Sequence, residues 1–277
     1  MSIAGPFSRA NITAHGRGYP MSSLILKGVG KRFGGLQAVT PFDMEIARGK
    51  ITGLIGPNGA GKTTVVNLIT GVYKLTQGSI RFGDVDLTEA PRHEVARAGL
   101  ARTYQTIRLL PDATVVANVM IGMYRHQKTS LLSQLFGMPS SRAETARFRD
   151  EVHKLLDRFG MTRYADYPAG ALSYGDQRRV EMMRALALKP EVLLLDEPVA
   201  GINDVESARL GEIFRVLVTE GDGMAVLLIE HNMRFVTNLC DYVYVLDSGE
   251  LISQGSAEQV VNDPVVIKAY LGEDEDA

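Results

Sequence analysis

The stretch that decides the fold is ITGLIGPNGAGKT, residues 51–63. From Gly56 to Thr63 it fits the pattern G-x-x-x-x-G-K-[ST] at every position. An apolar run, Ile51–Ile55, precedes the pattern, and a helix-like run, Lys62–Thr70, begins within it. This order of strand, loop and helix is the context that makes the pattern specific. The stretch therefore predicts a loop whose backbone N–H groups, with the N-terminus of the next helix, bind phosphates.

The polar residues of this loop indicate a nucleoside triphosphate as the ligand. We expect the Lys62 ammonium to reach the β- and γ-phosphates of ATP and the Thr63 hydroxyl to ligate Mg²⁺. ATP and Mg²⁺ are therefore the predicted cofactors. The alternative is a chance glycine-rich turn, which ordinary residue frequencies make rare. The predicted nucleotide-binding residues are Gly56, Pro57, Asn58, Gly59, Ala60, Gly61, Lys62, Thr63 and Thr64.

A second motif follows, in which the apolar run Val192–Leu195 ends in Asp196 and Glu197. A strand buried on both faces brings its terminal carboxylates to the carboxyl edge of a parallel sheet, beside the phosphate loop. Asp196 is predicted to hold Mg²⁺ directly or through water. Glu197 is predicted to accept a proton from the attacking water. The alternative is that both acids only end a strand in a solvated turn.

Strand-like and helix-like runs alternate along the rest of the chain, which indicates an α/β fold with a largely parallel sheet. Apolar residues over Arg142–Phe159 recur at helical spacing, and residues of about 110–175 are expected to form an inserted helical subdomain. The strand-like runs are Leu24–Val29, Phe42–Ile46, Ile51–Ile55, Ile80–Phe82, Leu100–Tyr104, Val192–Leu195, Val226–Ile229 and Tyr242–Leu246.

The composition excludes several classes of protein. The 277 residues carry 30 Lys+Arg against 32 Asp+Glu, a net charge of −2. A nucleic-acid binder would usually show a basic excess, so no nucleic-acid partner is expected. The lone cysteine, Cys240, cannot form an internal disulfide, and apolar runs such as Ala225–Ile229 are far too short to span a membrane.

The sequence predicts that both ends of the chain lie outside the folded domain. Residues 1–22 hold no apolar stretch typical of a secretory signal and are predicted to be a disordered extension, with Met21 as a second candidate start. Residues 273–277 form a predicted acidic tail. The folded domain is expected over residues 23–272.

A third motif, Leu172-Ser173-Tyr174-Gly175-Asp176-Gln177, lies just before the Asp–Glu strand. Ser173 and Asp176 have the [ST]-x-x-[DE] spacing of a helix cap, so a helix N-terminus is expected there. The motif resembles the signature of ATP-binding-cassette (ABC) ATPases, whose commonest form is LSGGQ. With Gln105 and His231 added, the chain from about Leu24 to Leu271 resembles one ABC nucleotide-binding domain.

Four further stretches are similar to the ATP-binding subunits of branched-chain amino acid importers. They are Arg32–Val39, Arg102–Leu109, Ala200–Asn203 and Asp263–Gly272. The resemblance implies a P-loop NTPase fold with an antiparallel β subdomain and an inserted α-helical subdomain. It also implies an ATP-hydrolysing motor that closes as a head-to-tail dimer on two ATP molecules.

The resemblance assigns roles to residues that carry little signal alone. Ser173 and Gly175 would contact ATP held by the second subunit. Gln105 would sense the γ-phosphate and Mg²⁺ and couple to a membrane partner, while His231 would touch the γ-phosphate and hold the water. Independently of the resemblance, Phe33 is the best candidate to stack on adenine, its alternative being an edge-strand aromatic.

The implied partners are two transmembrane permease subunits, a second ATP-binding subunit (identical or paralogous) and, indirectly, a periplasmic binding protein. The implied location is peripheral, on the cytoplasmic face of the inner membrane. Three positions depart from the family pattern: Tyr174 replaces a glycine, Asp176 a glutamine or glutamate, and Asn203 an aspartate.

Two alternative functions stay open. One is an ABC motor for another substrate, either urea or amide import or lipid or lipopolysaccharide export. The other is a soluble ABC protein of translation or DNA repair. That class generally carries two cassettes or long coiled insertions, and the single phosphate loop and the balanced charge of this chain argue against it.

Overall fold

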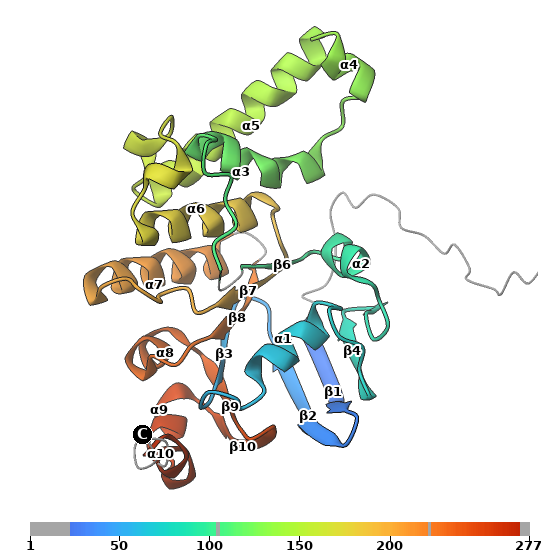
Figure 1. Cartoon of the computed structure of the whole chain (residues 1–277), viewed down its shortest axis with the longest axis vertical. Coiled ribbons are helices and arrows are strands. Elements are labelled where there is room, and N and C mark those ends of the chain that lie inside the picture. Colours follow the sequence, from blue (N-terminus) through green and yellow to red (C-terminus); the bar gives the residue numbers. More distant parts are fainter. Residues whose placement is uncertain (1–22, 104–105, 221–222, 272–277) are drawn as a thin grey trace, which may run out of the picture.

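The computed structural model describes residues 23–103, 106–220 and 223–271. Two β-sheets lie in its lower part with helices around them, and the helices between residues 115 and 158 form its upper part (Figure 1). The predicted extension 1–22, the predicted tail 273–277 and Gln105 lie outside the described residues. No helix in these ranges is both long enough and apolar enough to cross a membrane.

The central sheet has six strands in the order β10-β9-β3-β8-β7-β6. Strands β9, β3, β8, β7 and β6 are parallel, and β10 pairs antiparallel with β9. This confirms the predicted α/β fold. The strands are β3 (Ile51–Ile55), β6 (Leu100–Arg102), β7 (Val192–Asp196), β8 (Ala225–Ile229), β9 (Tyr242–Asp247) and β10 (Glu250–Gly255).

Continuous apolar runs form β3, β7 and β8 because apolar side chains cover both faces of the sheet. All five residues of each of these strands are buried. In β7, Leu193 and Leu195 belong to one apolar cluster, while Val192 and Leu194 belong to the cluster on the opposite face. The carboxyl end of β7 therefore has a fixed position, which determines where Asp196 lies.

A second, antiparallel sheet has the order β2-β1-β4-β5 and matches the antiparallel subdomain that the family resemblance implies. Its first two strands run further than the sequence pattern predicts. Irregular pairing between Leu26 and Val29, and again up to Arg32, breaks the alternation of buried and exposed residues. The strands are β1 (Leu24–Phe33), β2 (Leu36–Ile46), β4 (Gln77–Phe82) and β5 (Val85–Asp86).

Helices fill the interval between β6 and β7, where the helical insertion is predicted. The longest, α5, begins at Pro139, three residues before the predicted start, because proline suits the first turn of a helix. Its buried residues Phe148, Val152 and Leu156 follow the predicted face. The helices of this interval are α3 (Val115–Met123), η1 (Tyr124–His126), α4 (Leu131–Leu135), α5 (Pro139–Arg158), η2 (Thr162–Tyr164), η3 (Ala169–Ala171) and α6 (Tyr174–Ala187).

The remaining helices connect or follow the strands of the two sheets. The sequence predicts the helix after the phosphate loop, the one around Leu210 and the one after β8; it does not predict α2, α9 or α10. At the end of α8, the thiol of Cys240 lies so near Gly53 of β3 that a Cβ there would be 3.0 Å from Sγ. These helices are α1 (Lys62–Ile69), α2 (Arg92–Arg97), α7 (Asp204–Thr219), α8 (Met233–Leu239), α9 (Ala257–Val261) and α10 (Pro264–Leu271).

Candidate active site

The phosphate loop lies between β3 and α1, as predicted. Its glycines are required by the backbone. Gly56 has φ +145°, and a Cβ there would overlap the carbonyl oxygen of Leu246 in β9. Gly61 has φ +98°, and a Cβ there would lie 3.0 Å from the carbonyl oxygen of Ala38. Side chains at either position would push the loop away from the sheet.

The loop and the Asp–Glu motif share one cavity of about 210 Å³. Lys62 lies in it with Nζ donating to the carbonyl oxygens of Gly56 at 2.5 Å and Pro57 at 2.6 Å. A phosphate would replace these backbone acceptors with charged ones, which form stronger hydrogen bonds. The lining residues are Asn58, Gly59, Ala60, Gly61, Lys62, Thr63, Thr64, Asp196, Glu197 and Ile229.

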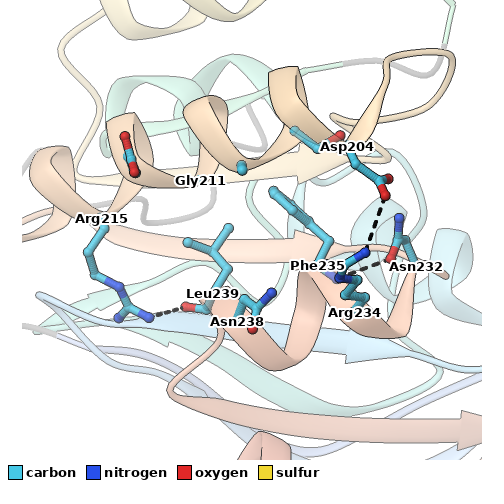
Figure 2. Close-up of a pocket in the computed structure, with 11 residues that line it drawn as sticks. Asp204, Gly211, Arg215, Asn232, Arg234, Phe235, Asn238 and Leu239 are labelled. Carbon is cyan, nitrogen blue, oxygen red and sulfur yellow. Dashed lines mark hydrogen bonds and ion pairs between the residues drawn. The ribbon is translucent and has the colours of Figure 1, made fainter.

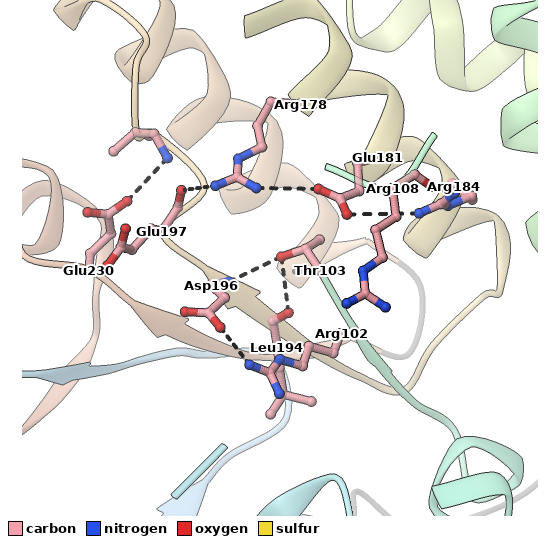
Figure 3. Close-up of polar contacts among 11 residues, drawn as sticks. Arg102, Thr103, Arg108, Arg178, Glu181, Arg184, Leu194, Asp196, Glu197 and Glu230 are labelled. Atoms are coloured by element: carbon pink, nitrogen blue, oxygen red, sulfur yellow. Dashed lines mark hydrogen bonds and ion pairs between the residues drawn. The ribbon is translucent and has the colours of Figure 1, made fainter. Parts of the chain in front are cut away.

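Asp196 is fixed by residues that the sequence did not single out. Its Oδ2 accepts a hydrogen bond from Nη2 of Arg102 at 2.7 Å, and Nη1 of Arg102 donates to Oδ1 of Asn67 at 2.8 Å. The backbone N–H of Asp196 donates to Oγ1 of Thr103 at 3.1 Å (Figure 3). Arg102 is the last residue of the edge strand β6, which pairs with β7. A charged residue at the end of an apolar strand is the sequence feature that could have indicated its role.

Removing one partner of the Arg102–Asp196 pair should be strongly destabilising, since only 10% and 7% of the two side chains are exposed. We expect Arg102→Met to lower the free energy of unfolding by about 3–5 kcal/mol, because it leaves a buried carboxylate without its cation. Urea denaturation measures this. The control is Arg234→Met, whose ion pair with Asp204 is exposed and should matter little. Equal effects of the two substitutions would contradict the prediction.

Glu197 and His231, both predicted to be catalytic, lie close together. Oε1 of Glu197 is 3.9 Å from Nδ1 of His231. The Glu197 side chain is 22% exposed and that of His231 62%. Glu197 has the left-handed φ of +48°, and its N–H donates to the carbonyl oxygen of Ile229 at 2.9 Å. A carboxylate at the cavity wall with a neighbouring imidazole can orient and deprotonate water.

Glu230 is a second residue that sequence reasoning missed. Its carboxylate, on a side chain only 1% exposed, accepts the backbone N–H groups of Val199 at 3.2 Å, His231 at 3.1 Å and Asn232 at 3.4 Å. Burial raises the pKa of the Glu230 carboxyl above its usual range, and these three hydrogen bonds oppose that rise. Glu230 thus ties the turn after Glu197 to the turn that carries His231.

The residues present suit a magnesium ion. Thr63 and Asp196 line the same cavity, and their oxygens are of the kind that Mg²⁺ prefers. Across residues 23–103, 106–220 and 223–271, no group of three or more His, Cys, Asp or Glu side chains forms a metal site on its own. The cation would therefore complete its shell with phosphate oxygens and water. The third predicted ligand, Gln105, lies outside the described residues.

Ser173 and Gly175 do not line the cavity of the phosphate loop. Oγ of Ser173 accepts the N–H of Asp176 at 3.2 Å, which confirms the predicted helix cap. The same hydroxyl donates to Oδ2 of Asp176 at 2.9 Å. Ser173 is exposed, and the start of α6 lies in another part of the molecule from α1 (Figure 1). Within one chain, these predicted ATP contacts stand apart from Lys62.

Phe33 lies at the end of β1, with its side chain 42% exposed. Its ring meets Tyr73 edge-on, with centroids 5.3 Å apart, and Nζ of Lys31 lies 4.8 Å from the ring centroid. The ring is not part of the lining of the loop cavity. Its stacking on adenine stays a prediction.

Another cavity, of about 330 Å³, lies between α7 and α8 (Figure 2). Its arginines are engaged by protein groups: Arg234 pairs with Asp204 at 3.3 Å, and Nη2 of Arg215 donates to the carbonyl oxygen of Leu239 at 2.6 Å. With its cations already bound, this cavity is less suited to phosphate than the glycine loop.

Comparison with known proteins gives consistent matches. The family model "ABC transporter" matches residues 39–200, and that of "Branched-chain amino acid ATP-binding cassette transporter" matches residues 250–276. The high-affinity branched-chain amino acid transport ATP-binding protein LivG of Escherichia coli K12 is 42% identical over 90% of this chain and 98% of its own length. The corresponding BraF of Pseudomonas aeruginosa is 39% identical over the same shares.

A solved structure of an ATP-binding cassette of an ABC transporter, in its ADP conformation, is similar with a TM-score of 0.76. Its sequence is 31% identical, and the match covers 91% of this chain and 100% of that one.

Proposed function

Because this chain belongs to the ABC transporter family, we propose that it is the ATP-hydrolysing motor subunit of a branched-chain amino acid importer. The observation that carries the ATPase activity is the single cavity in which the phosphate loop, Asp196 and Glu197 meet, with His231 beside Glu197. The names of LivG and BraF support the substrate class over urea, amides, lipid or lipopolysaccharide.

In the proposed reaction, ATP binds with its phosphates against the N–H groups of the loop and the start of α1. Lys62 exchanges its two carbonyl partners for phosphate oxygens. Thr63 and Asp196 would hold Mg²⁺, which neutralises phosphate charge when bound. Glu197 accepts the proton of the attacking water, and His231 orients that water. Arg102 holds the Asp196 carboxylate, and Glu230 keeps the turns of Glu197 and His231 together.

The proposed working unit is a head-to-tail dimer with an identical or paralogous subunit. Two observations support it. Ser173 and Gly175 lie outside the loop cavity of their own chain, and the capped N-terminus of α6 carries partial positive charge that suits the γ-phosphate of a second subunit. Closing on two ATP molecules would then depend on contacts that only the closed dimer makes.

The proposed permease contact is a groove of about 320 Å³, which we call the subdomain groove. It lies between α2 and β6 on one side and α3 and α6 on the other, and Ile121 in its wall is 40% exposed. A groove lined by apolar residues together with arginines such as Arg92 and Arg184 suits a helix of another protein. The two permease subunits would place the chain on the cytoplasmic face of the inner membrane, and a periplasmic binding protein would act through them.

Uptake measurements test the substrate class. Deleting the gene should lower uptake of radiolabelled leucine, isoleucine and valine, because the permease loses its source of energy. The wild-type gene should restore uptake and the Glu197→Gln gene should not. Uptake of an unrelated sugar serves as the control. Unchanged branched-chain amino acid uptake with a loss of urea or amide uptake would contradict the assignment.

A further inference from the structure

The most buried arginine in the described part of the chain lies behind Glu197. Arg178 of α6 is 1% exposed, and its guanidinium donates to Glu197 and Glu181 (Figure 3). Nη2 donates to the carbonyl oxygen of Glu197 at 3.1 Å, and Nη1 donates to Oε2 of Glu181 at 3.4 Å. Removing a guanidinium from water costs several kcal/mol, so both acceptors are needed to keep it there. The contact fixes the backbone of Glu197 and leaves its carboxylate for the cavity.

The backbone of Glu197 needs such a partner because its conformation is unfavourable. A non-glycine residue at φ +48° costs of order 1–3 kcal/mol and persists only where its surroundings hold it. The Glu197 carbonyl also accepts the N–H of Ala200 at 3.2 Å. If the turn relaxed to ordinary φ values, the Cα–Cβ bond would change direction. The carboxylate would then leave its place beside His231.

Glu181, the carboxylate partner of Arg178, is in turn close to a second arginine. Glu181, whose side chain is 2% exposed, lies with Oε1 3.9 Å from Nη2 of Arg184. Nη1 of Arg184 donates to the carbonyl oxygen of Arg108 at 2.5 Å. Glu181 and Arg184 both line the subdomain groove. A row of polar contacts therefore runs from the turn of Glu197 through Arg178 and Glu181 to the groove wall.

From these contacts we propose that Arg178 is a positioning residue for hydrolysis: it holds the Glu197 turn in its left-handed conformation, with Glu181 fixing the guanidinium. The proposal rests on the proposed role of Glu197 as the base. Arg178 acts on the rate of the chemical step and not on ATP binding, because its hydrogen bonds to Glu197 and Glu181 hold the turn after β7 and not the phosphate loop.

The test uses the full chain with two changes at this site. Arg178→Lys keeps a charge beside Glu181, but one compact ammonium does not reproduce the planar fork that spans both acceptors. The double variant Arg178→Met/Glu181→Met removes both buried charges together and so avoids the orphaned carboxylate of the single methionine variant. The matched control is Arg215→Met. Arg215 lies in α7, away from Glu197, and pairs with Asp241 at 2.9 Å.

We expect kcat for ATP hydrolysis to fall by about 10- to 100-fold in both Arg178 variants, since misplacing a catalytic group by an ångström has effects of that size. The Kd for ATP by calorimetry and the circular dichroism spectrum should match the wild type, and Arg215→Met should leave kcat near its wild-type value. In a Glu197→Gln background, the Arg178 variants should cause no further fall.

Each contrary result has its own meaning. Wild-type kcat in the double variant, while Glu197→Gln is inactive, overturns the positioning role and leaves the base assignment standing. An equal loss of ATP affinity, or an altered dichroism spectrum, assigns Arg178 a general structural role and also overturns the proposal. Wild-type turnover in Glu197→Gln itself overturns the proposed base and the positioning role with it.

Discussion

Turnover of ATP should fall by about 10²–10⁴-fold when Glu197 is replaced by glutamine, because an amide cannot take the proton of the attacking water. The change is nearly isosteric, and the Glu197 backbone is held by its N–H bond to Ile229 and by Arg178. ATP affinity should therefore stay close to that of the wild type. Single-turnover hydrolysis and calorimetry measure the two quantities separately.

The same variant should accumulate as an ATP-bound dimer, which size-exclusion chromatography with ATP would reveal. Asp204→Asn is the matched control, since this acid starts α7 and is 80% exposed. It should change turnover little. Near-normal hydrolysis by Glu197→Gln would remove Glu197 from the role of base.

Lys62→Ala should abolish detectable ATP binding. The Lys62 ammonium is the compact side-chain charge of the phosphate loop, and it donates to the backbone carbonyl groups of Gly56 and Pro57 in that loop. Calorimetry with ATP measures the loss. Lys189→Ala is the control, because that ammonium pairs with Glu151 elsewhere on the surface. Unchanged ATP affinity in Lys62→Ala would contradict the loop as the nucleotide site.

Mixing Lys62→Ala with a Ser173→Arg variant extends this result to the dimer. Ser173→Arg should bind ATP as a monomer and fail to dimerise, because it adds bulk and charge at the capped start of α6. In a head-to-tail mixed dimer, one composite site carries both lesions and the other carries neither. Partial recovery of hydrolysis on mixing supports the arrangement in trans. A Ser173→Arg monomer that keeps its fold and loses ATP binding would refute it.

The parts of the site that could be predicted are those carried by short, continuous stretches of sequence. The glycine loop lies between β3 and α1 as expected, because a motif and two apolar runs of ordinary length agree there. Asp196 and Glu197 meet it, since a strand buried on both faces leaves one place for its carboxyl end. The resemblance to ABC ATPases is confirmed by the family match and by LivG.

The parts that could not be predicted depend on side chains distant in sequence. Arg102 and Asp196 are 94 residues apart, and Arg178 and Glu197 are 19 apart. The sequence alone does not distinguish a buried arginine on α6 from an exposed one, because burial depends on how α6 packs. The left-handed backbone of Glu197 is also invisible in the sequence, because nothing about a glutamate indicates it.

Strand ends were missed for a different reason. Alternation between apolar and polar residues predicts a strand only while its pairing is regular. The register shifts in β1 exchange the two faces, and the pattern therefore stops at Val29 although the strand continues to Phe33. The helix α4 is not predicted because its five residues, Leu131–Leu135, are too few to show a helical period.

The packing of Cys240 against Gly53 has a practical consequence for spectroscopy. The chain contains one cysteine, and burial raises the pKa of its thiol to about 12, so almost none of it is the reactive thiolate at neutral pH. A cysteine introduced on the surface would therefore be modified by maleimide dyes or spin labels while the native thiol is spared. Subunit closure can thus be followed by interprobe distances in a protein whose interior has not been altered.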